Sequence, residues 1–136
     1  MSEGLVHGSL VSHAFDFFVA SYGDELDLLL RDSPGLRATD KPPKIGRYVP
    51  DVWGQSRRRV LIGEAKTFVD LQTQHTVDQL RCFFYHIVDS PPGSKLVVCV
   101  PTFARPRATQ IVRSFGQADF EINAYCIVLG AEVVSP

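Results

Sequence analysis

Residues 48–67 read YVPDVWGQSRRRVLIGEAKT and predict an antiparallel β-hairpin. The runs 48–54 and 59–67 contain the β-branched and aromatic residues that are typical of strands. The polar residues 55–58 between the two runs suit a turn. The hairpin would place the beginning of this stretch beside its end, so residues that are far apart in sequence are expected to meet at one edge of a sheet.

The two strands of this hairpin carry the chemically most informative side chains of the chain. Because side chains alternate along a strand, Glu64 and Lys66 are expected to project from one face of the sheet. Gly63 and Ala65 then lie on the opposite face, where their small size would let a helix approach closely. Pairing about the turn places Asp51 across from this segment. The sequence therefore predicts that two carboxylates and one amine converge.

The rest of the chain shows further helical and strand patterns. Apolar spacing and flanking breakers predict helices over residues 9–22, 73–88 and 106–115, a second helical stretch over residues 24–31, an exposed connection over residues 37–47, and buried strands over residues 95–101 and 124–129. This order indicates an α/β fold with a mixed central sheet flanked by helices. No repeat or second domain is visible in the sequence, so residues 1–136 are expected to form a single domain.

Composition narrows the class of protein. The 136 residues are 45% apolar and 21% charged, which is typical of a globular protein and excludes a chain that is mainly disordered. No apolar stretch approaches the roughly 20 residues that a membrane helix requires. The three cysteines, Cys82, Cys99 and Cys126, lie far apart in apolar segments, which favours buried free thiols over disulfides. We therefore expect a cytoplasmic protein with no membrane association.

Positive charge is concentrated in the middle of the chain. The formal net charge is -1, yet residues 31–66 hold nine of the fourteen Lys and Arg residues, whereas residues 1–30 hold none. The cations that we predict to contact nucleic-acid phosphates beside the hairpin edge are Lys41, Lys44, Arg47, Arg57, Arg58 and Arg59. The alternative is a solvated turn that keeps the sheet edge soluble. A smaller second cluster consists of Arg105, Arg107 and Arg113.

The expected edge of the hairpin suits metal-assisted chemistry. Two carboxylates near a backbone carbonyl form a hard-oxygen site for Mg²⁺, with Mn²⁺ as a substitute. Asp51 and Glu64 would supply the carboxylates. The amine of Lys66 would orient an attacking water or neutralise the charge that builds up on phosphorus. Hydrolysis of a phosphodiester is the reaction that these three groups jointly suit.

These residues also resemble a family. Pro50-Asp51 followed by Glu64-Ala65-Lys66 resembles the PD-(D/E)XK signature of restriction-endonuclease-like proteins and archaeal-type Holliday junction resolvases. The resemblance implies a restriction-endonuclease-like core of helix, strand meander, helix and strand. It also implies that Asp51 and Glu64 bind the metal, that Ala65 contributes its carbonyl, and that Lys66 is catalytic.

Two further positions follow from the resemblance. Several branches of the superfamily keep a helical Gln near the site, and Gln79 stands at that place. The apolar stripe of its own helix leaves a second reading open, in which Gln79 meets solvent. Many relatives also place an acidic residue on the first helix, where this chain offers Asp16 or Glu3.

The sequence thus predicts a Mg²⁺-dependent DNA endonuclease. A homodimer is expected, because one such core contains a single site and two-fold pairing would let it cut both strands. One alternative is a noncatalytic nucleic-acid-binding or assembly subunit on the same fold, and another is a nuclease subunit that is active within a larger complex. The simplest alternative is a surface hairpin with an ordinary cross-strand ion pair.

Overall fold

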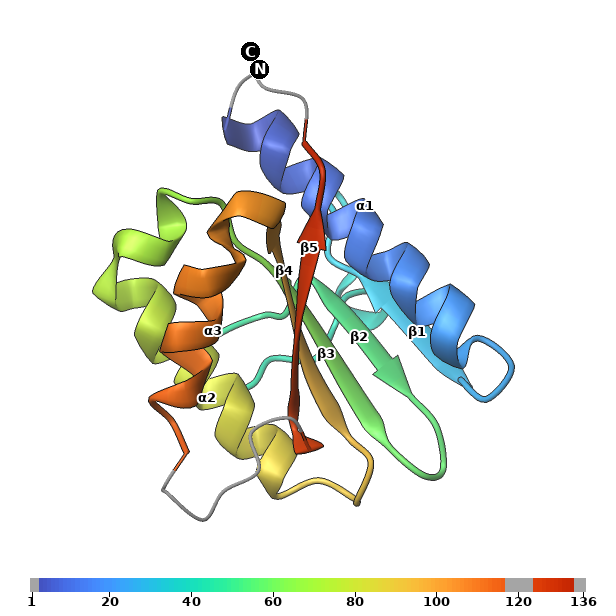
Figure 1. Ribbon diagram of the computed structural model, residues 1–136. Helices are drawn as coiled ribbons and strands as arrows, with labels where there is room; N and C mark the ends of the chain where they lie inside the picture. The colour runs from blue at the N-terminus through green and yellow to red at the C-terminus, as the bar shows by residue number, and fades with distance from the viewer. Residues whose placement is uncertain (1–2, 117–123, 134–136) are drawn as a thin grey trace.

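A five-stranded mixed sheet forms the centre of the computed structural model, which describes residues 3–116 and 124–133 (Figure 1). The helices and strands, in chain order, are α1 (Glu3–Tyr22), β1 (Leu28–Arg31), β2 (Val52–Gln55), β3 (Val60–Ala65), α2 (Gln74–Val88), β4 (Lys95–Pro101), α3 (Arg105–Arg113) and β5 (Cys126–Ala131). Three short 3-10 helices are η1 (Ala38–Asp40), η2 (Asp70–Gln72) and η3 (Thr102–Ala104). The α/β class and the mixed sheet agree with the sequence prediction.

The strands lie in the sheet in the order in which they occur along the chain. β1, β2 and β3 form an antiparallel meander, and β3, β4 and β5 run parallel to one another. The parallel connections are long enough to contain α2 and α3, as a parallel crossover requires. The predicted hairpin is confirmed, with Val52 opposite Gly63 and Gln55 opposite Val60.

Helices cover both faces of the sheet. α1 lies on one face, whereas α2 and α3 lie on the other (Figure 1). The apolar residues of α1 that pack on the sheet are Leu10, Val11, Ala14 and Phe18. The residues of α2 in the second core are Leu80, Phe83, Phe84 and Ile87. Residues 96–101 of β4 are buried, in agreement with the predicted strand that is covered on both sides.

Close packing of α1 depends on the small residues of β3. A Cβ atom placed on Gly63 would lie 3.2 Å from Cζ of Phe18 and 3.1 Å from Cβ of Val52. Ala65, on the same face, is also buried. The face of β3 opposite Glu64 therefore accepts a helix at short range, as the sequence predicted.

One predicted helix is wrong. Residues 28–31 form strand β1 rather than part of a helix over 24–31, and Leu30 pairs with Trp53 of β2. The leucines of this segment suit a helix locally, but a turn after Tyr22 and an open edge of the hairpin favour pairing with β2. The connection over 37–47 is also less exposed than expected, since Ile45 belongs to the core beside α2.

The boundaries of other predicted elements shift by a few residues. α1 begins at Glu3 rather than near residue 9, and β2 begins at Val52 rather than at Tyr48, which instead forms an isolated bridge with Ile45. Within the described residues, no helix is both long and apolar enough to cross a membrane. The cysteines are free thiols, and burial raises the pKa of Cys99 and of Cys126 to about 12.

Candidate active site

A cleft of about 510 Å³ opens where β3 ends and β2 begins, beside the first turns of α1 and α2. Its lining residues include Asp51, Glu64, Ala65, Lys66 and Gln79, which are the residues that the sequence predicted for catalysis and metal binding. The hairpin register brings the residue before Val52 next to the residue after Gly63. Glu64 points away from α1 because it alternates with Gly63 and Ala65 along β3.

Asp51 and Glu64 are each held by the backbone of the opposite strand. The backbone N–H of Asp51 donates a hydrogen bond to Oε1 of Glu64 at 3.1 Å. The backbone N–H of Ala65 donates to Oδ2 of Asp51 at 2.8 Å. This reciprocal pair of hydrogen bonds fixes both carboxylates, so their proximity follows from strand pairing and does not depend on a flexible side chain.

Lys66 lies at the same place. Its Nζ atom is 3.3 Å from Oε2 of Glu64 and donates a hydrogen bond to Oε1 of Gln79. Glu64, Lys66 and Gln79 are only 3%, 8% and 8% exposed. The reading in which Gln79 meets solvent is therefore wrong, because the N-terminal half of α2 packs against the end of β3. The Thr73 cap, whose Oγ1 accepts from the Thr76 N–H, sets where α2 begins.

The surroundings of the cleft raise the pKa of both carboxyl groups. Burial raises the pKa of Glu64 well above its ordinary value, and the charge of Asp51 raises it further, whereas Lys66 lowers it. Burial also raises the pKa of Asp51, although the Ala65 N–H and the Glu64 carboxyl oppose that shift. The charge of Asp51 contributes to the raised pKa of Glu64, so the two carboxyls interact directly. A proton or a cation held by the pair relieves their mutual repulsion.

His7 of α1 is a site residue that the sequence analysis did not predict. Its Nε2 atom is 3.4 Å from Oδ2 of Asp51, and its side chain lines the cleft. No local pattern marks this residue, because the contact depends on how α1 crosses the sheet. Asp16, offered as the acidic residue of the first helix, is exposed and does not line the cleft, and the side chain of Glu3 lies outside the described residues.

The structure does not bring the three arginines of the hairpin turn to the site. Arg57 and Arg58 are exposed at the turn of the hairpin. This turn lies about 13 Å along the strand from Asp51, which is at the other end of the hairpin. Arg59 forms an ion pair with Glu25, with 2.6 Å between Nε and Oε1. The expectation that these cations flank the carboxylates is therefore wrong, because strand length separates the turn from the site.

The cations of the connection before β2 lie closer. Lys41 and Lys44 line a separate hollow that includes Trp53 of β2. Arg47 stacks over the ring of Tyr48 at 5.4 Å, and that ring contacts His75 at 5.7 Å between ring centroids. His75 lines the active-site cleft, so the Tyr48 ring connects Arg47 to it, and Val49 lines both the cleft and the hollow of Lys41 and Lys44.

The oxygen atoms in the cleft are of the chemical type that a magnesium ion prefers as ligands. Among residues 3–116 and 124–133, no cluster of three or more His, Cys, Asp or Glu side chains is placed to hold a metal. Mg²⁺, however, commonly takes one or two protein carboxylates and fills its remaining positions with water and substrate phosphate. Asp51, Glu64 and the Ala65 carbonyl match that requirement for hard oxygen ligands.

Comparisons of the chain with protein-family models, with curated proteins and with solved structures found no match.

Proposed function

We propose that the protein is a metal-dependent nuclease that hydrolyses phosphodiester bonds of DNA at the Asp51 and Glu64 cleft. The observation that carries this proposal is the convergence of the buried Glu64 carboxylate, the partly buried Asp51 carboxylate and the buried Lys66 amine in a cleft that is open to a ligand. An ordinary surface ion pair would not be buried in this way. A pair of carboxyls with raised pKa values is also more typical of a functional site than of a structural ion pair.

Asp51 and Glu64, with the carbonyl of Ala65, would hold the cation. When bound, a divalent cation makes water more acidic and stabilises negative charge on a phosphoryl group. The backbone hydrogen bonds to both carboxylates keep them in place before any ligand arrives. Such preorganisation matters because a site that needs no rearrangement stabilises a transition state more effectively.

The amine of Lys66 would act on the substrate side of the cleft. Its three N–H donors can be shared between Glu64, Gln79 and an oxygen of the substrate or of the attacking water. Gln79 is a positioning residue, since its side-chain carbonyl accepts from Lys66 and fixes the direction of that amine. His7 is placed to orient Asp51 or to donate to a phosphate oxygen.

The fold supports the same proposal. A helix, a three-stranded antiparallel meander, a helix and a parallel strand occur in this order from α1 to β4. The family resemblance implies the same order of elements. In this chain the residues that resemble the signature lie just before β2 (Asp51) and at the end of β3 (Glu64 and Lys66). We therefore include a restriction-endonuclease-like core in the proposal. Fold alone does not establish an activity, so the site residues carry the argument.

Two partners belong to the proposal. One cleft per chain would cut one strand, so cleavage of both strands requires a homodimer or a larger complex that supplies a second site. Sedimentation of the purified protein, alone and with DNA, would distinguish these cases. A monomer that nicks single strands would exclude the need for pairing.

Plasmid nicking tests the activity. We expect Mg²⁺ or Mn²⁺ to support nicking, and Asp51→Asn, Glu64→Gln and Lys66→Met each to lower the rate by roughly 10²-fold or more. Asp89→Asn is the matched control, because Asp89 is exposed at the far end of α2. Circular dichroism of each variant would confirm that it folds.

Two results would contradict the proposal. Undiminished nicking by Lys66→Met would point to a contaminating nuclease. Alternatively, calorimetry could show no binding of Mg²⁺ or Mn²⁺ that depends on Asp51 and Glu64, while DNA still binds. That result would favour the noncatalytic binding or assembly subunit.

A further inference from the structure

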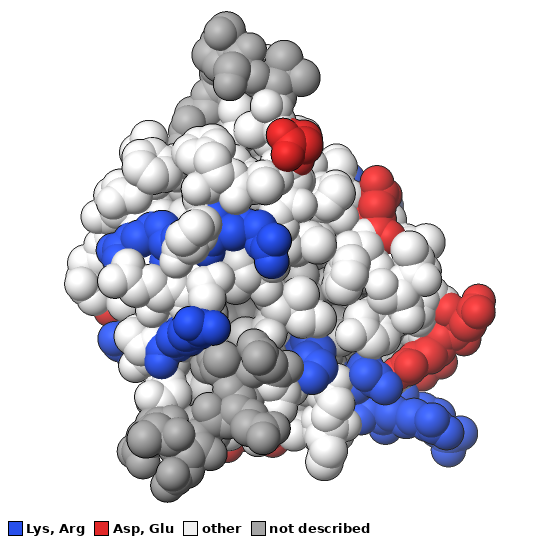
Figure 2. Space-filling model, in the orientation of Figure 1, with Lys and Arg blue, Asp and Glu red and all other residues white. Residues whose placement is uncertain are grey.

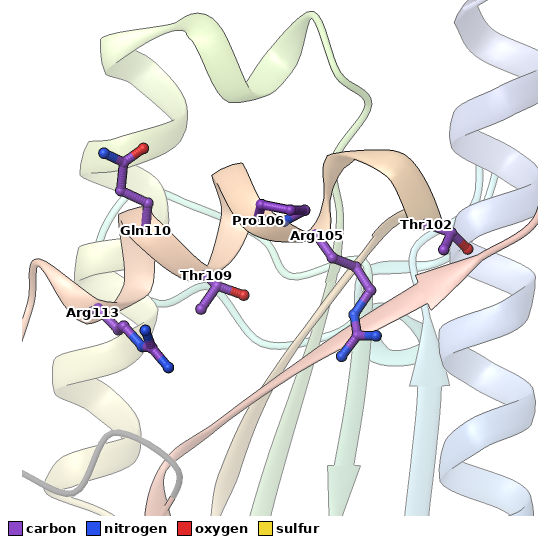
Figure 3. A pocket seen from close by; sticks show the side chains of 6 residues that line it. All are labelled: Thr102, Arg105, Pro106, Thr109, Gln110 and Arg113. Carbon is purple, nitrogen blue, oxygen red and sulfur yellow. The ribbon is translucent and has the colours of Figure 1, made fainter.

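Another hollow, of about 650 Å³, lies along α3 (Figure 3). Its lining residues are Thr102, Arg105, Pro106, Thr109, Gln110 and Arg113. Arg105, Thr109 and Arg113 are four residues apart, so they form one stripe along the helix, and Figure 3 shows all three side chains extending from the same side of it. The first and last of them are separated by about 12 Å along the helix axis. The hollow is therefore a groove with a cation near each end and a hydroxyl between them.

The sheet supports the first of these arginines. Gly130 of β5 has no side chain, and a Cβ atom placed there would lie 2.5 Å from Cδ of Arg105. The aliphatic part of Arg105 thus lies directly on the strand, which leaves its guanidinium at the exposed groove. Among the described residues, neither Arg105 nor Arg113 forms an ion pair. Figure 2 shows Lys and Arg side chains over α3, while the larger Asp and Glu groups lie toward the top and the right-hand margin.

Two exposed aromatic rings belong to residues that neighbour, in sequence, the linings of this groove and of the active-site cleft. Phe68 and Phe103 are 47% and 69% exposed, and their ring centroids are 5.7 Å apart. Phe68 directly follows Thr67, which lines the cleft, and Phe103 directly follows Thr102, which lines the groove. Each ring is therefore one residue along the chain from a lining residue of one hollow, and the two rings contact each other.

We propose that a single-stranded segment of nucleic acid runs from the active-site cleft across Phe68 and Phe103 into the groove of α3. This inference rests on the proposed function and specifies its substrate as one with unpaired bases beside the cleaved bond. Exposed rings stack on bases whose faces are free, and a duplex buries those faces. Arg105, Thr109 and Arg113 offer charged and hydroxyl donors to successive phosphates along the strand.

Other occupants account for less of this surface. A small anion would use the two arginines but would leave the exposed rings without a role. A protein partner would cover the rings but would not by itself require a groove with two cations and a hydroxyl stripe. A single strand uses both features, and its path ends at the residues proposed to cleave it.

Binding without metal tests the path independently of cleavage. Fluorescence anisotropy in EDTA would compare a labelled oligothymidylate with a duplex of equal length at several salt concentrations. We expect tighter binding of the single strand. Arg105→Ala and Arg113→Ala should each reduce the slope of log affinity against log salt by about 0.7, the value for one phosphate contact on a single strand. Arg37→Ala, an exposed arginine outside the groove, is the control and should leave the slope unchanged.

A substitution that keeps an apolar side chain but removes the ring distinguishes base stacking from simple apolar contact. Phe103→Leu keeps an apolar side chain but removes the aromatic face, and we expect it to weaken single-strand binding by about tenfold. Tyr85→Leu is the control, because Tyr85 is similarly exposed but lies on α2. Since Phe103 and Tyr85 are each more than half exposed, these variants are expected to fold, and thermal melting would check this.

The outcomes separate this inference from the proposed function. Single-strand binding that depends on the groove and the rings, without metal-dependent cleavage, would support the path and overturn the nuclease. Cleavage that depends on Lys66 but ignores Arg105, Arg113 and Phe103 would overturn the path and leave the nuclease. Equal binding by Phe103→Leu and the wild type, or self-association that depends on Phe68 and Phe103 without nucleic-acid binding, would also overturn it.

Discussion

Lys66 and Gln79 meet at the end of β3, where Nζ of Lys66 donates to Oε1 of Gln79 and both residues are only 8% exposed. Thirteen residues separate them in the sequence, and they belong to different elements of the fold. This contact turns a strand residue and a helix residue into one unit, and it directs a buried amine toward Glu64, 3.3 Å away.

Removal of the Gln79 side-chain carbonyl should lower both the free energy of unfolding and the activity. Gln79→Ala leaves one N–H of the buried Lys66 amine without its protein acceptor, and we expect the free energy of unfolding to fall by about 1–3 kcal/mol. Activity should fall as well, and Gln79→Glu should restore stability more than activity, because it supplies an acceptor but adds a third carboxyl. Urea denaturation and nicking rates measure the two effects. Full activity in Gln79→Ala would show that Lys66 needs no positioning.

The raised pKa of Glu64 predicts a particular dependence of stability on pH in the absence of metal. The folded state holds the Glu64 proton more tightly than the unfolded state does. Its contribution to stability is therefore present below the ordinary carboxyl pKa and is lost as pH rises through the raised value. Glu64→Gln removes this titration. We expect the variant to gain stability relative to the wild type as pH increases from about 4 to about 8.

Denaturant unfolding of both proteins in EDTA across that pH range measures the difference. Parallel stability curves would show that Glu64 does not titrate abnormally. Addition of Mg²⁺ should stabilise the wild type more at high pH than at low pH, because the cation competes with the proton for the same carboxyls. Glu64→Gln should lose much of that stabilisation.

Two glycines provide a matched test of packing. Gly63→Ala places a methyl group within 3.2 Å of both Phe18 and Val52, and we expect it to destabilise the protein by about 1–3 kcal/mol. Gly8 lies in α1 with no atom within 4 Å of an added Cβ, so Gly8→Ala should stabilise the protein by up to about 1 kcal/mol. Thermal unfolding of the two variants checks both signs. A neutral Gly63→Ala would mean that α1 does not approach β3 so closely.

The cysteines should differ in reactivity. Burial and a pKa of about 12 leave roughly one in ten thousand of the Cys99 and Cys126 thiols ionised near pH 8, so alkylation of the native protein should spare both. Cys82 is partly exposed and should react first. Intact mass and peptide mapping, before and after unfolding in urea, would measure this order. Equal rates at Cys82 and Cys99 in the native protein would contradict it.

Local chemistry in the sequence was sufficient for much of the fold. The hairpin, α2, α3 and the buried strand β4 follow from alternation, helical spacing and breakers, which act within a few residues. The helix predicted over residues 24–31 failed because β1 is stabilised by pairing with β2, which lies more than twenty residues later in the chain. Such pairing outweighs a weak local preference.

The candidate site likewise has some features that the sequence predicts and others that only the tertiary structure fixes. Asp51, Glu64 and Lys66 could be placed together from the sequence, because strand alternation and hairpin register are properties of one continuous stretch. The distance of Arg57 and Arg58 from the cleft follows from the length of the same hairpin. The burial of Gln79 and the contact of His7 with Asp51 were decided by tertiary structure. They depend on where α1 and α2 cross the sheet, and such crossings arise from the packing of whole faces, which no single segment encodes.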